Sequence, residues 1–353
     1  MIPNLIDFND ILPYFDELYG LSMEIYSSPG DFSHMMENKL LATLFYEPST
    51  RTQFSFQAAM YRLGGKVIGF SDANSSSVSK GETLSDTVKI VSGYSDFIVI
   101  RHPVEGAAYA ASLYSGVPVI NAGDGGHFHP TQTIADLITV KKEKSTLSGL
   151  KIGICGDLKN GRTVHSLIRA LSEFKGNEFY LISTAELDVP KYIKDYMKVR
   201  GIIYHNANSI NECIETLDIL YMTRIQKERF VSIDEYNSQA GLFILDEDKL
   251  VKAKNDLLIL HPLPRVDEIH YNVDRDLRAF YFKQAEYGMY GRMALLLLFD
   301  KYLTLKNGFD LLQSNTDMKC INPRCIVNHE KNLPNLSTFT DGGYACSYCE
   351  HSM

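Results

Sequence analysis

Arginine and hydroxyl side chains gather where a helix is expected to begin. The run Ser49-Thr50-Arg51-Thr52 opens the amphipathic segment TQFSFQAAMYRL. First-turn N–H groups have no partner inside a helix, and together with the helix dipole they attract anions. A guanidinium adds a planar fork that matches phosphate oxygens. This run predicts a phosphate site, and the alternative is an ordinary helix cap beside a solvated arginine.

Other polar side chains stand at expected strand ends and helix starts. Arg101 closes the strand-like run IVIR, where ligands bind in α/β folds. His129 heads a helix and is suited to donate a hydrogen bond to a carbonyl oxygen, although a capping histidine is the simpler interpretation. Ser76 and Lys80 belong to a serine-rich loop, in which a lone lysine is usually just solvated.

The second half of the chain repeats this placement. The segment 156–163 joins an expected strand to a helix but matches neither G-x-G-x-x-G nor a Walker A loop, so nucleotide binding is not indicated. Arg162 begins that helix and suits an anion. Arg224 and Gln226 follow another strand, two residues apart. In Pro262-Leu263-Pro264, two fixed φ angles and two missing donors leave carbonyls that suit an ammonium group.

The combined set contains arginines, a histidine, a glutamine and hydroxyls, without an evident nucleophile–base dyad or paired carboxylates. Such a set favours binding two anionic substrates and stabilising negative charge that develops during reaction. It does not favour a covalent intermediate.

Four of the six cysteines lie near the end of the chain. Cys320-x4-Cys325 is followed after twenty residues by Cys346-x2-Cys349. This spacing predicts a closed, tetrahedral and structural zinc site, the alternative being four free thiols. From Asp317 onward acidic residues slightly outnumber basic ones, so the segment is a poor binder of nucleic acid.

Short β-branched runs alternate with helix-length amphipathic segments, which predicts βαβ units and parallel sheets. Expected strands are 66–71, 97–101, 117–121, 151–156, 178–183, 219–222, 242–244 and 257–261. Expected helices include 52–63, 83–92, 131–144, 163–174 and 285–305. The fold class is therefore α/β, with two doubly wound parallel-sheet domains and a small C-terminal zinc ribbon.

Length and composition agree with two domains plus an appendage. The chain has 353 residues, 45% of them hydrophobic, and a formal net charge of −8. We expect domains at 1–145 and 146–285, helix 286–305 packing back on the first domain, a linker at 306–317 and a zinc domain at 318–353. The N-terminus lacks the features of a signal peptide. The longest apolar run, Met293–Phe299, is far shorter than the about 20 residues that span a bilayer. We expect a cytoplasmic protein with no membrane or nucleic-acid partner.

These motifs together resemble the transcarbamoylases. The runs STRT, KGET, RHP and HPTQ are similar to the carbamoyl-phosphate half of that family. The segments GDLKNGRTVHS, YMTRIQKER and HPLPRVDEI resemble its aspartate-specific branch. The likeness covers nearly all of residues 1–305, and it implies carbamoyl transfer from carbamoyl phosphate to L-aspartate, an early step of pyrimidine biosynthesis, with no cofactor for catalysis.

The resemblance also implies a role for each matching position. Carbamoyl phosphate would be bound by Ser49, Thr50, Arg51, Thr52, Ser76, Lys80, Arg101, His129, Gln132 and Leu263. Aspartate would be bound by Lys80, Arg162, Arg224, Gln226, Pro262 and Leu263. The catalytic groups would be Arg51, Thr52, Arg101 and His129. Ser76, chosen by counting back from Lys80, would reach with it into a neighbouring chain, which implies a trimer with shared sites.

The cysteine segment resembles the zinc domain of the aspartate transcarbamoylase regulatory chain, which docks regulatory onto catalytic chains. Here it follows the catalytic part after only a linker, without the nucleotide-binding domain, so control by nucleotides is in doubt. We expect the ribbon to pack on catalytic chains and to stabilise the oligomer.

Two other functions compete. An ornithine-type transcarbamoylase would share the first half but would recognise a cationic side chain, whereas Arg162 and Arg224 favour a dicarboxylate. A catalytically silent scaffold subunit would be expected to have lost catalytic groups, and this chain keeps every one named above.

Overall fold

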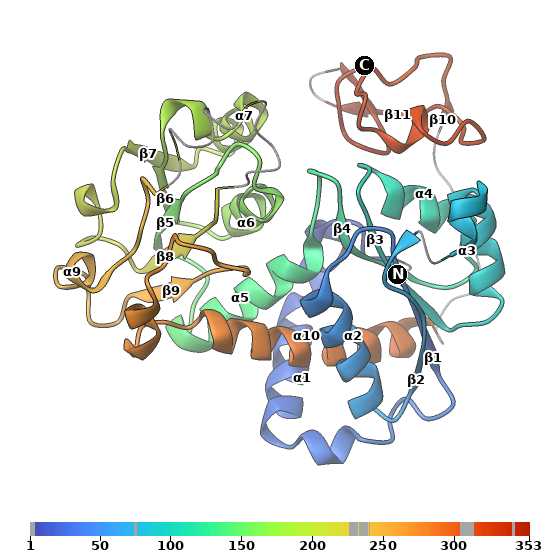
Figure 1. Cartoon of the computed structure of the whole chain (residues 1–353), viewed down its shortest axis with the longest axis horizontal. Helices are drawn as coiled ribbons and strands as arrows, with labels where there is room; N and C mark the ends of the chain where they lie inside the picture. The colour runs from blue at the N-terminus through green and yellow to red at the C-terminus, as the bar shows by residue number, and fades with distance from the viewer. Residues whose placement is uncertain are drawn as a thin grey trace. The chain divides into compact units, whose positions relative to one another are not determined.

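The computed structural model of the chain describes residues 4–73, 76–225, 232, 239, 241–303, 314–340 and 343–353 (Figure 1). It divides into two compact units, Met1–Thr131 with Met289–Met353, and Gln132–Gly288. Among the described helices, none is long and apolar enough to cross a membrane.

The first unit is built on a four-stranded parallel sheet in the order β2-β1-β3-β4. Its strands are β1 (Leu40–Phe45), β2 (Lys66–Phe70), β3 (Phe97–His102) and β4 (Val119–Asp124). The inner strands are apolar and almost entirely buried, as expected for a parallel sheet covered on both faces, while edge strand β2 is largely exposed. The helices of this unit include α1 (Phe15–Ser27), α2 (Thr50–Arg62), α3 (Leu84–Ser92) and α4 (Ala107–Tyr114).

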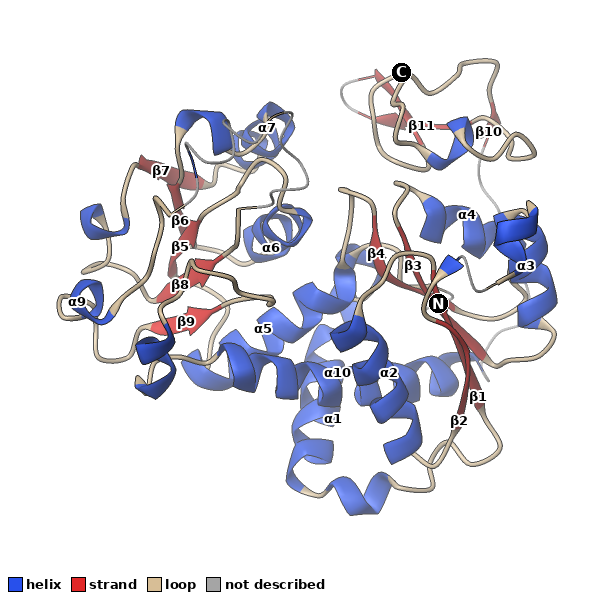
Figure 2. Cartoon of the chain, in the orientation of Figure 1, coloured by secondary structure: helices blue, strands red, loops and turns tan. Residues whose placement is uncertain are grey.

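The second unit holds a five-stranded parallel sheet in the order β7-β6-β5-β8-β9 (Figure 2). The strands are β5 (Lys151–Cys155), β6 (Glu178–Ile182), β7 (Ile203–Ala207), β8 (Ile219–Met222) and β9 (Leu258–Leu260). The described helices of this unit include α6 (Arg162–Ser172), α7 (Lys191–Val199) and the short α9 (Glu247–Leu250). The boundary between the units falls within α5 (Pro130–Lys144) and α10 (Tyr281–Leu303).

The C-terminal segment forms a small antiparallel sheet from β10 (Ser314–Asn315), β11 (Leu336–Thr340) and β12 (Gly343–Cys346). We call residues 316–353 the cysteine module. It belongs to the first unit and shares a hydrophobic cluster with α3 and α4. The module's buried members of this cluster are Cys320, Cys325, Ile326, Leu333, Leu336, Cys346, Tyr348 and Cys349.

The predicted α/β class with two parallel sheets is confirmed. One predicted strand, 242–244, is wrong: Gly241 has a φ of 80° and opens a turn, and only Leu245 bridges to Ile269. β1 and β7 were not expected; β7 is a half-exposed edge strand, and its polar residues hide the strand pattern. Residues 306–313 of the predicted linker, 306–317, lie outside the described residues.

Candidate active site

Three neighbouring strands deliver predicted site residues to one edge of the first sheet. Ser49, the N-cap of α2, lies four residues after the end of β1; Arg101 is the second-last residue of β3; and His129 follows β4. The carboxyl ends of parallel strands meet at the same edge of a sheet, where α/β proteins bind ligands. The backbone holds this edge together, because Tyr46 N donates to Arg101 O at 2.8 Å.

Arg101 and His129 come together at this edge. Arg101 Nη1 lies 3.4 Å from His129 Nε2 and also donates to Ala122 O at 3.3 Å. Arg101 Nη2 forms an ion pair with Glu47 Oε2 at 3.2 Å. The arginine side chain is 12% exposed and His129 only 5%. A guanidinium and an imidazole therefore converge in a poorly hydrated place, where donors stabilise developing negative charge best.

The start of α2, which follows β1, offers its first-turn N–H groups at the same edge of the sheet. The Ser49 side chain makes no capping hydrogen bond in this helix; its hydroxyl donates instead to Thr52 Oγ1 at 3.1 Å. Thr52 is buried, whereas Arg51 is exposed. The helix start thus has the composition and the geometry of an anion site.

Ser76 is the N-cap of a short 3-10 turn, Ser77–Lys80, and Lys80 is the last residue of that turn. The Ser76 hydroxyl accepts from Val78 N at 3.3 Å and donates to Ala73 O at 2.7 Å. Lys80 is exposed at the end of this turn.

In the second unit, three adjacent strands again place predicted residues at one edge. Arg162 is the first residue of α6 after β5, Arg224 follows β8, and Leu263 follows β9. Both arginines are half-buried. Gln226 lies outside the described residues.

A buried histidine, His261, stabilises the Pro262-Leu263 turn. His261 is 2% exposed; its Nδ1 accepts from Leu263 N at 2.7 Å and its Nε2 donates to Glu268 Oε1 at 2.6 Å. Burial is the largest single effect on Glu268 and opposes its ionisation, but the hydrogen bond and the charge of His261 together with backbone hydrogen bonds outweigh it and lower the pKa of that carboxyl. Leu263 has a φ of 55° and precedes a cis peptide bond.

Sequence reasoning missed a buried carboxylate that links several of these parts. Asp136 Oδ1 accepts from Gln132 Nε2 at 2.7 Å and from Gln284 Nε2 at 2.6 Å. Its Oδ2 accepts from Tyr221 Oη at 3.0 Å, and burial followed by this charge raises the tyrosine pKa well above its usual value. Gln284 Oε1 in turn accepts from His261 N at 3.0 Å. Only the spacing of Gln132 and Asp136, one helical turn apart, hinted at this hub.

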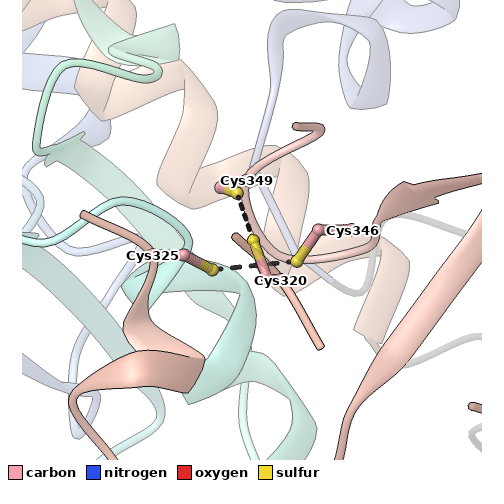
Figure 3. Close-up of side chains that lie close together, drawn as sticks. All are labelled: Cys320, Cys325, Cys346 and Cys349. Carbon is pink, nitrogen blue, oxygen red and sulfur yellow. Dashed lines mark hydrogen bonds between the residues drawn. The ribbon is translucent and has the colours of Figure 1, made fainter. Parts of the chain in front are cut away.

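The four module cysteines are buried and form a candidate metal site (Figure 3). Their sulfur atoms all lie within 4.8 Å of one another. The Cys320–Cys349 and Cys325–Cys346 pairs are 3.6 and 3.7 Å apart. A tetrahedral zinc with bonds of about 2.3 Å to sulfur has its ligands about 3.8 Å apart, so the group fits such an ion. Burial raises the pKa of the Cys320 thiol to about 12, a cost that a bound cation would offset.

Comparison with known proteins gives the class of this chain. The model described as aspartate/ornithine carbamoyltransferase, carbamoyl-P binding domain, matches residues 6–142. The model for the Asp/Orn binding domain of the same enzymes matches residues 148–299. The chain therefore belongs to the aspartate/ornithine carbamoyltransferase family, and the cysteine module lies beyond both models.

Individual relatives point to one branch of the family. The aspartate carbamoyltransferase catalytic subunits of Clostridium kluyveri and Clostridium novyi are 55% and 58% identical, over 83% of this chain and 96% of each relative. The catalytic subunit of M. jannaschii aspartate transcarbamoylase gives a TM-score of 0.81 at 46% identity, covering 86% of this chain and 100% of that one. The Trypanosoma cruzi enzyme with N-(phosphonacetyl)-L-aspartic acid gives 0.75 at 36%, covering 83% and 92%. The resemblance noted in the sequence is thereby confirmed.

Proposed function

We propose that this chain transfers the carbamoyl group of carbamoyl phosphate to L-aspartate, giving N-carbamoyl-L-aspartate and phosphate in pyrimidine biosynthesis. The observation that carries this reaction is the pairing of Arg101 with His129, 3.4 Å apart at the sheet edge. The family membership and the named relatives support it, and a relative from Trypanosoma cruzi has been solved with carbamoyl phosphate and aspartate.

Carbamoyl phosphate would be anchored by its phosphate at the start of α2. Ser49, Thr50 and Arg51 contribute hydroxyls, a guanidinium and first-turn N–H groups, which together match phosphate oxygens. Arg101 and His129 then face the carbonyl oxygen with Thr52. In this proposal Gln132, held by Asp136, would bind the carbamoyl amide, and the Leu263 carbonyl would contact the same group.

L-aspartate would be selected by two arginines. Arg162 and Arg224 provide one guanidinium for each carboxylate, and Gln226 supports them. The stiff Pro262-Leu263 turn offers carbonyls to the attacking amino group. Ornithine has only one carboxylate and a cationic side chain, so the same arginines disfavour it.

The uncharged amine attacks the carbonyl carbon, and a tetrahedral oxyanion forms against Thr52, Arg101 and His129. The bond to phosphate then breaks, and the departing phosphate takes the amine proton. Holding both substrates in line is worth up to about 7–11 kcal/mol. Each oxyanion donor is worth about 3–4 kcal/mol.

A scaffold without catalytic activity is the alternative from another class, and one variant separates it from the enzyme. Arg51→Ala removes a phosphate ligand without touching the core, because Arg51 is exposed. We expect turnover to fall at least about 100-fold, in line with loss of a charge-assisted contact. Absence of turnover in the parent chain would favour the scaffold, whereas unchanged turnover in the variant would contradict the role given to Arg51.

The active site would be completed by a neighbouring chain in a trimer in the cytoplasm. Lys80 is exposed, at the end of its turn. We expect a mixture of two inactive variants, Lys80→Ala and Arg51→Ala, to regain activity after their subunits are exchanged, since some sites would then receive both residues. No regain after proven exchange would mean that each chain supplies its own Lys80.

The metal of the cysteine module would be zinc in a structural role, and the module would stabilise the oligomer. The sulfur spacing and the four-thiolate set support zinc. Cys346→Ser should remove zinc and lower both the solution mass and the melting temperature. Loss of zinc with assembly and stability unchanged would contradict this role.

A further inference from the structure

The cysteine module is joined to the loop that follows Arg101. Glu105 N donates to Arg324 O at 3.0 Å, and Ile326 N donates to Glu105 O at 2.9 Å. The buried carboxylate of Glu105 accepts from Asn322 Nδ2 at 2.7 Å and pairs with Arg324 Nε at 3.2 Å. Asn322 Nδ2 also lies 3.5 Å from Cys349 Sγ, so the module side of this contact adjoins the metal ligands.

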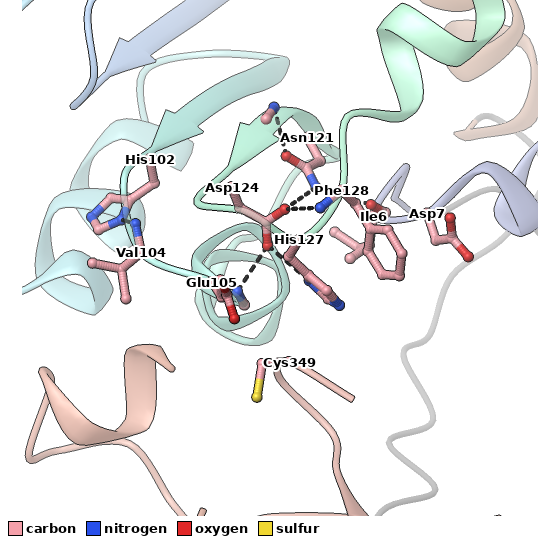
Figure 4. A network of polar contacts seen from close by, with 12 residues as sticks. Ile6, Asp7, His102, Val104, Glu105, Asn121, Asp124, His127, Phe128 and Cys349 are labelled. Carbon is pink, nitrogen blue, oxygen red and sulfur yellow. Dashed lines mark hydrogen bonds and ion pairs between the residues drawn. The ribbon is translucent and has the colours of Figure 1, made fainter. Parts of the chain in front are cut away.

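Gly106, the residue after Glu105, connects this contact to the segment that precedes His129. Gly106 N donates to Asp124 Oδ2 at 2.8 Å, while Asp124 Oδ1 accepts from Phe128 N at 3.0 Å (Figure 4). Asp124 is 1% exposed and also accepts from Asn121 Nδ2 at 3.0 Å. A single buried carboxylate thus holds both the loop that contacts the module and the residue directly before His129.

The cysteine module and the loop at Gly106 are packed too closely to move past one another. Gly106 has a φ of 81°, and an added Cβ would lie 2.6 Å from Tyr348 O. The Tyr109 and Tyr348 rings meet edge to face at 5.5 Å. Buried interfaces of this kind have discrete arrangements, so a displaced module must displace the loop that it contacts.

We propose that the cysteine module is a clamp for the catalytic loops, in which Glu105 and Asp124 are positioning residues that set the place of His129. This inference rests on the proposed function. It differs from the stabilising role given to zinc above, because it requires an effect on turnover in chains that are folded, assembled and loaded with metal.

The alternative is a module that packs on the first unit without any effect on catalysis. An attached module would need its apolar contacts, but it would not need a buried hydrogen-bonded carboxylate in the segment between Arg101 and α4. Leaving such a group unpaired is costly, so its bonds fix a single geometry. That geometry lies at the base of both loops that reach the Arg101–His129 pair.

The test compares Glu105→Ala with Glu105→Gln in the full-length, zinc-loaded chain. The alanine variant removes the side-chain acceptor, whereas glutamine still accepts from Asn322. Asn322→Ala cuts the same bond from the module side, should the first variant fold poorly. Thr338→Ala is the matched control, because the exposed Thr338 hydroxyl forms its hydrogen bond with the Ser347 hydroxyl inside the module.

We expect Glu105→Ala and Asn322→Ala to lower kcat about tenfold, within the roughly 100-fold that a misplaced loop can cost. The KM for aspartate, the zinc content and the oligomer mass should stay near those of the parent chain. Glu105→Gln and Thr338→Ala should keep at least half of the parent kcat. A kcat equal to that of the parent chain in all four variants, at normal zinc content, would overturn the clamp.

The same assay separates the clamp from the reaction itself. The parent chain, with carbamoyl phosphate and aspartate, reports on carbamoyl transfer, whatever the variants do. If the parent shows no transfer, the proposed function fails. If it does and the variants match it, only the clamp fails.

Discussion

At the scale of single residues, the function depends on where charges lie relative to strand ends. Arg101 lies near the end of β3 and His129 follows β4, and the sheet brings them within 3.4 Å although they are 28 positions apart in sequence. Their low exposure gives them strength as donors, because water competes poorly in such a place.

Replacing His129 by alanine tests its role as an oxyanion donor. We expect kcat to fall by about 10²–10³, with little change in the KM for carbamoyl phosphate, whose phosphate is held elsewhere. Steady-state phosphate release measures both values. His34→Ala, at an exposed position, is the control. A drop confined to KM would show that His129 only binds substrate.

His165 predicts a pH dependence of stability. Its Nε2 donates to Leu158 O and its Nδ1 accepts from Tyr192 Oη, both at 2.8 Å. Burial lowers its pKa from 6.5 to about 4. Between these values the unfolded chain binds the proton and the folded chain does not, so stability falls as pH falls from about 6.5 to 4.

Urea unfolding at pH 7 and pH 4.5 checks this expectation. His165 should account for on the order of 2 kcal/mol of the stability lost over that range. His165→Gln keeps a donor and an acceptor but does not titrate. The stability that this variant loses between the two pH values should therefore be smaller by that amount. Parallel losses in both proteins would rule out His165 as a source.

The residue scale also shows what sequence could and could not predict. Arg101, Arg162 and Arg224 were predicted as site residues because each stands near a strand end or helix start, a position readable from local pattern. The buried Asp136 and the half-buried Glu47 were not, since an acid bonded to distant donors looks like any other acid in the sequence. Tertiary contacts alone reveal them.

At the scale of elements, Asp136 ties α5 to β8 and α10. Replacing it by alanine leaves two buried donors, on Gln284 and Tyr221, and one half-buried donor, on Gln132, without their acceptor. Each buried donor is worth about 1–3 kcal/mol. We expect a loss of on the order of 3 kcal/mol in unfolding free energy, together with weaker binding of carbamoyl phosphate through Gln132. Chemical denaturation and the KM for carbamoyl phosphate are the measurements. Asp136→Asn should lose less unfolding free energy, and Asp31→Ala, a control at an exposed position, should lose almost none. Equal losses in all three variants would contradict the role of Asp136 in linking these elements.

Gly106 plays a corresponding part between α4 and the cysteine module. Gly106→Ala puts a Cβ against Tyr348 at positive φ, which alone costs about 1–2 kcal/mol. Amide hydrogen exchange in residues 320–353 should speed up. Gly116→Ala is the matched control at the other end of α4, with nothing within 4 Å of its added Cβ. Unchanged exchange in Gly106→Ala would mean that the module tolerates the clash.

Elements were predictable where burial and periodicity agree. The inner strands β3, β5 and β8 are continuous apolar runs, and their positions were close to those expected. The run 242–244 has similar composition, but Gly241 diverts it into a turn, so composition alone predicted a strand wrongly. Edge strand β7 showed the reverse, with pairing supplied by β6 despite polar residues.

At the scale of the whole molecule, a chain of this catalytic family carries an added cysteine module. The family models end at residue 299, and the module packs on α3 and α4 of the first unit. Cysteine spacing predicted a metal site, but no local pattern could predict the place of docking. That place depends on Glu105, Gly106 and the shape of the surface around them.

Acceptor choice tests the central claim most directly. The purified full-length chain should be given carbamoyl phosphate with either L-aspartate or L-ornithine, and phosphate release and the carbamoylated product should be measured. We predict release with aspartate, formation of N-carbamoyl-L-aspartate, and no release above background with ornithine. Release with ornithine instead, or with neither acceptor, would contradict the assignment of Arg162 and Arg224 to a dicarboxylate and with it the proposed reaction.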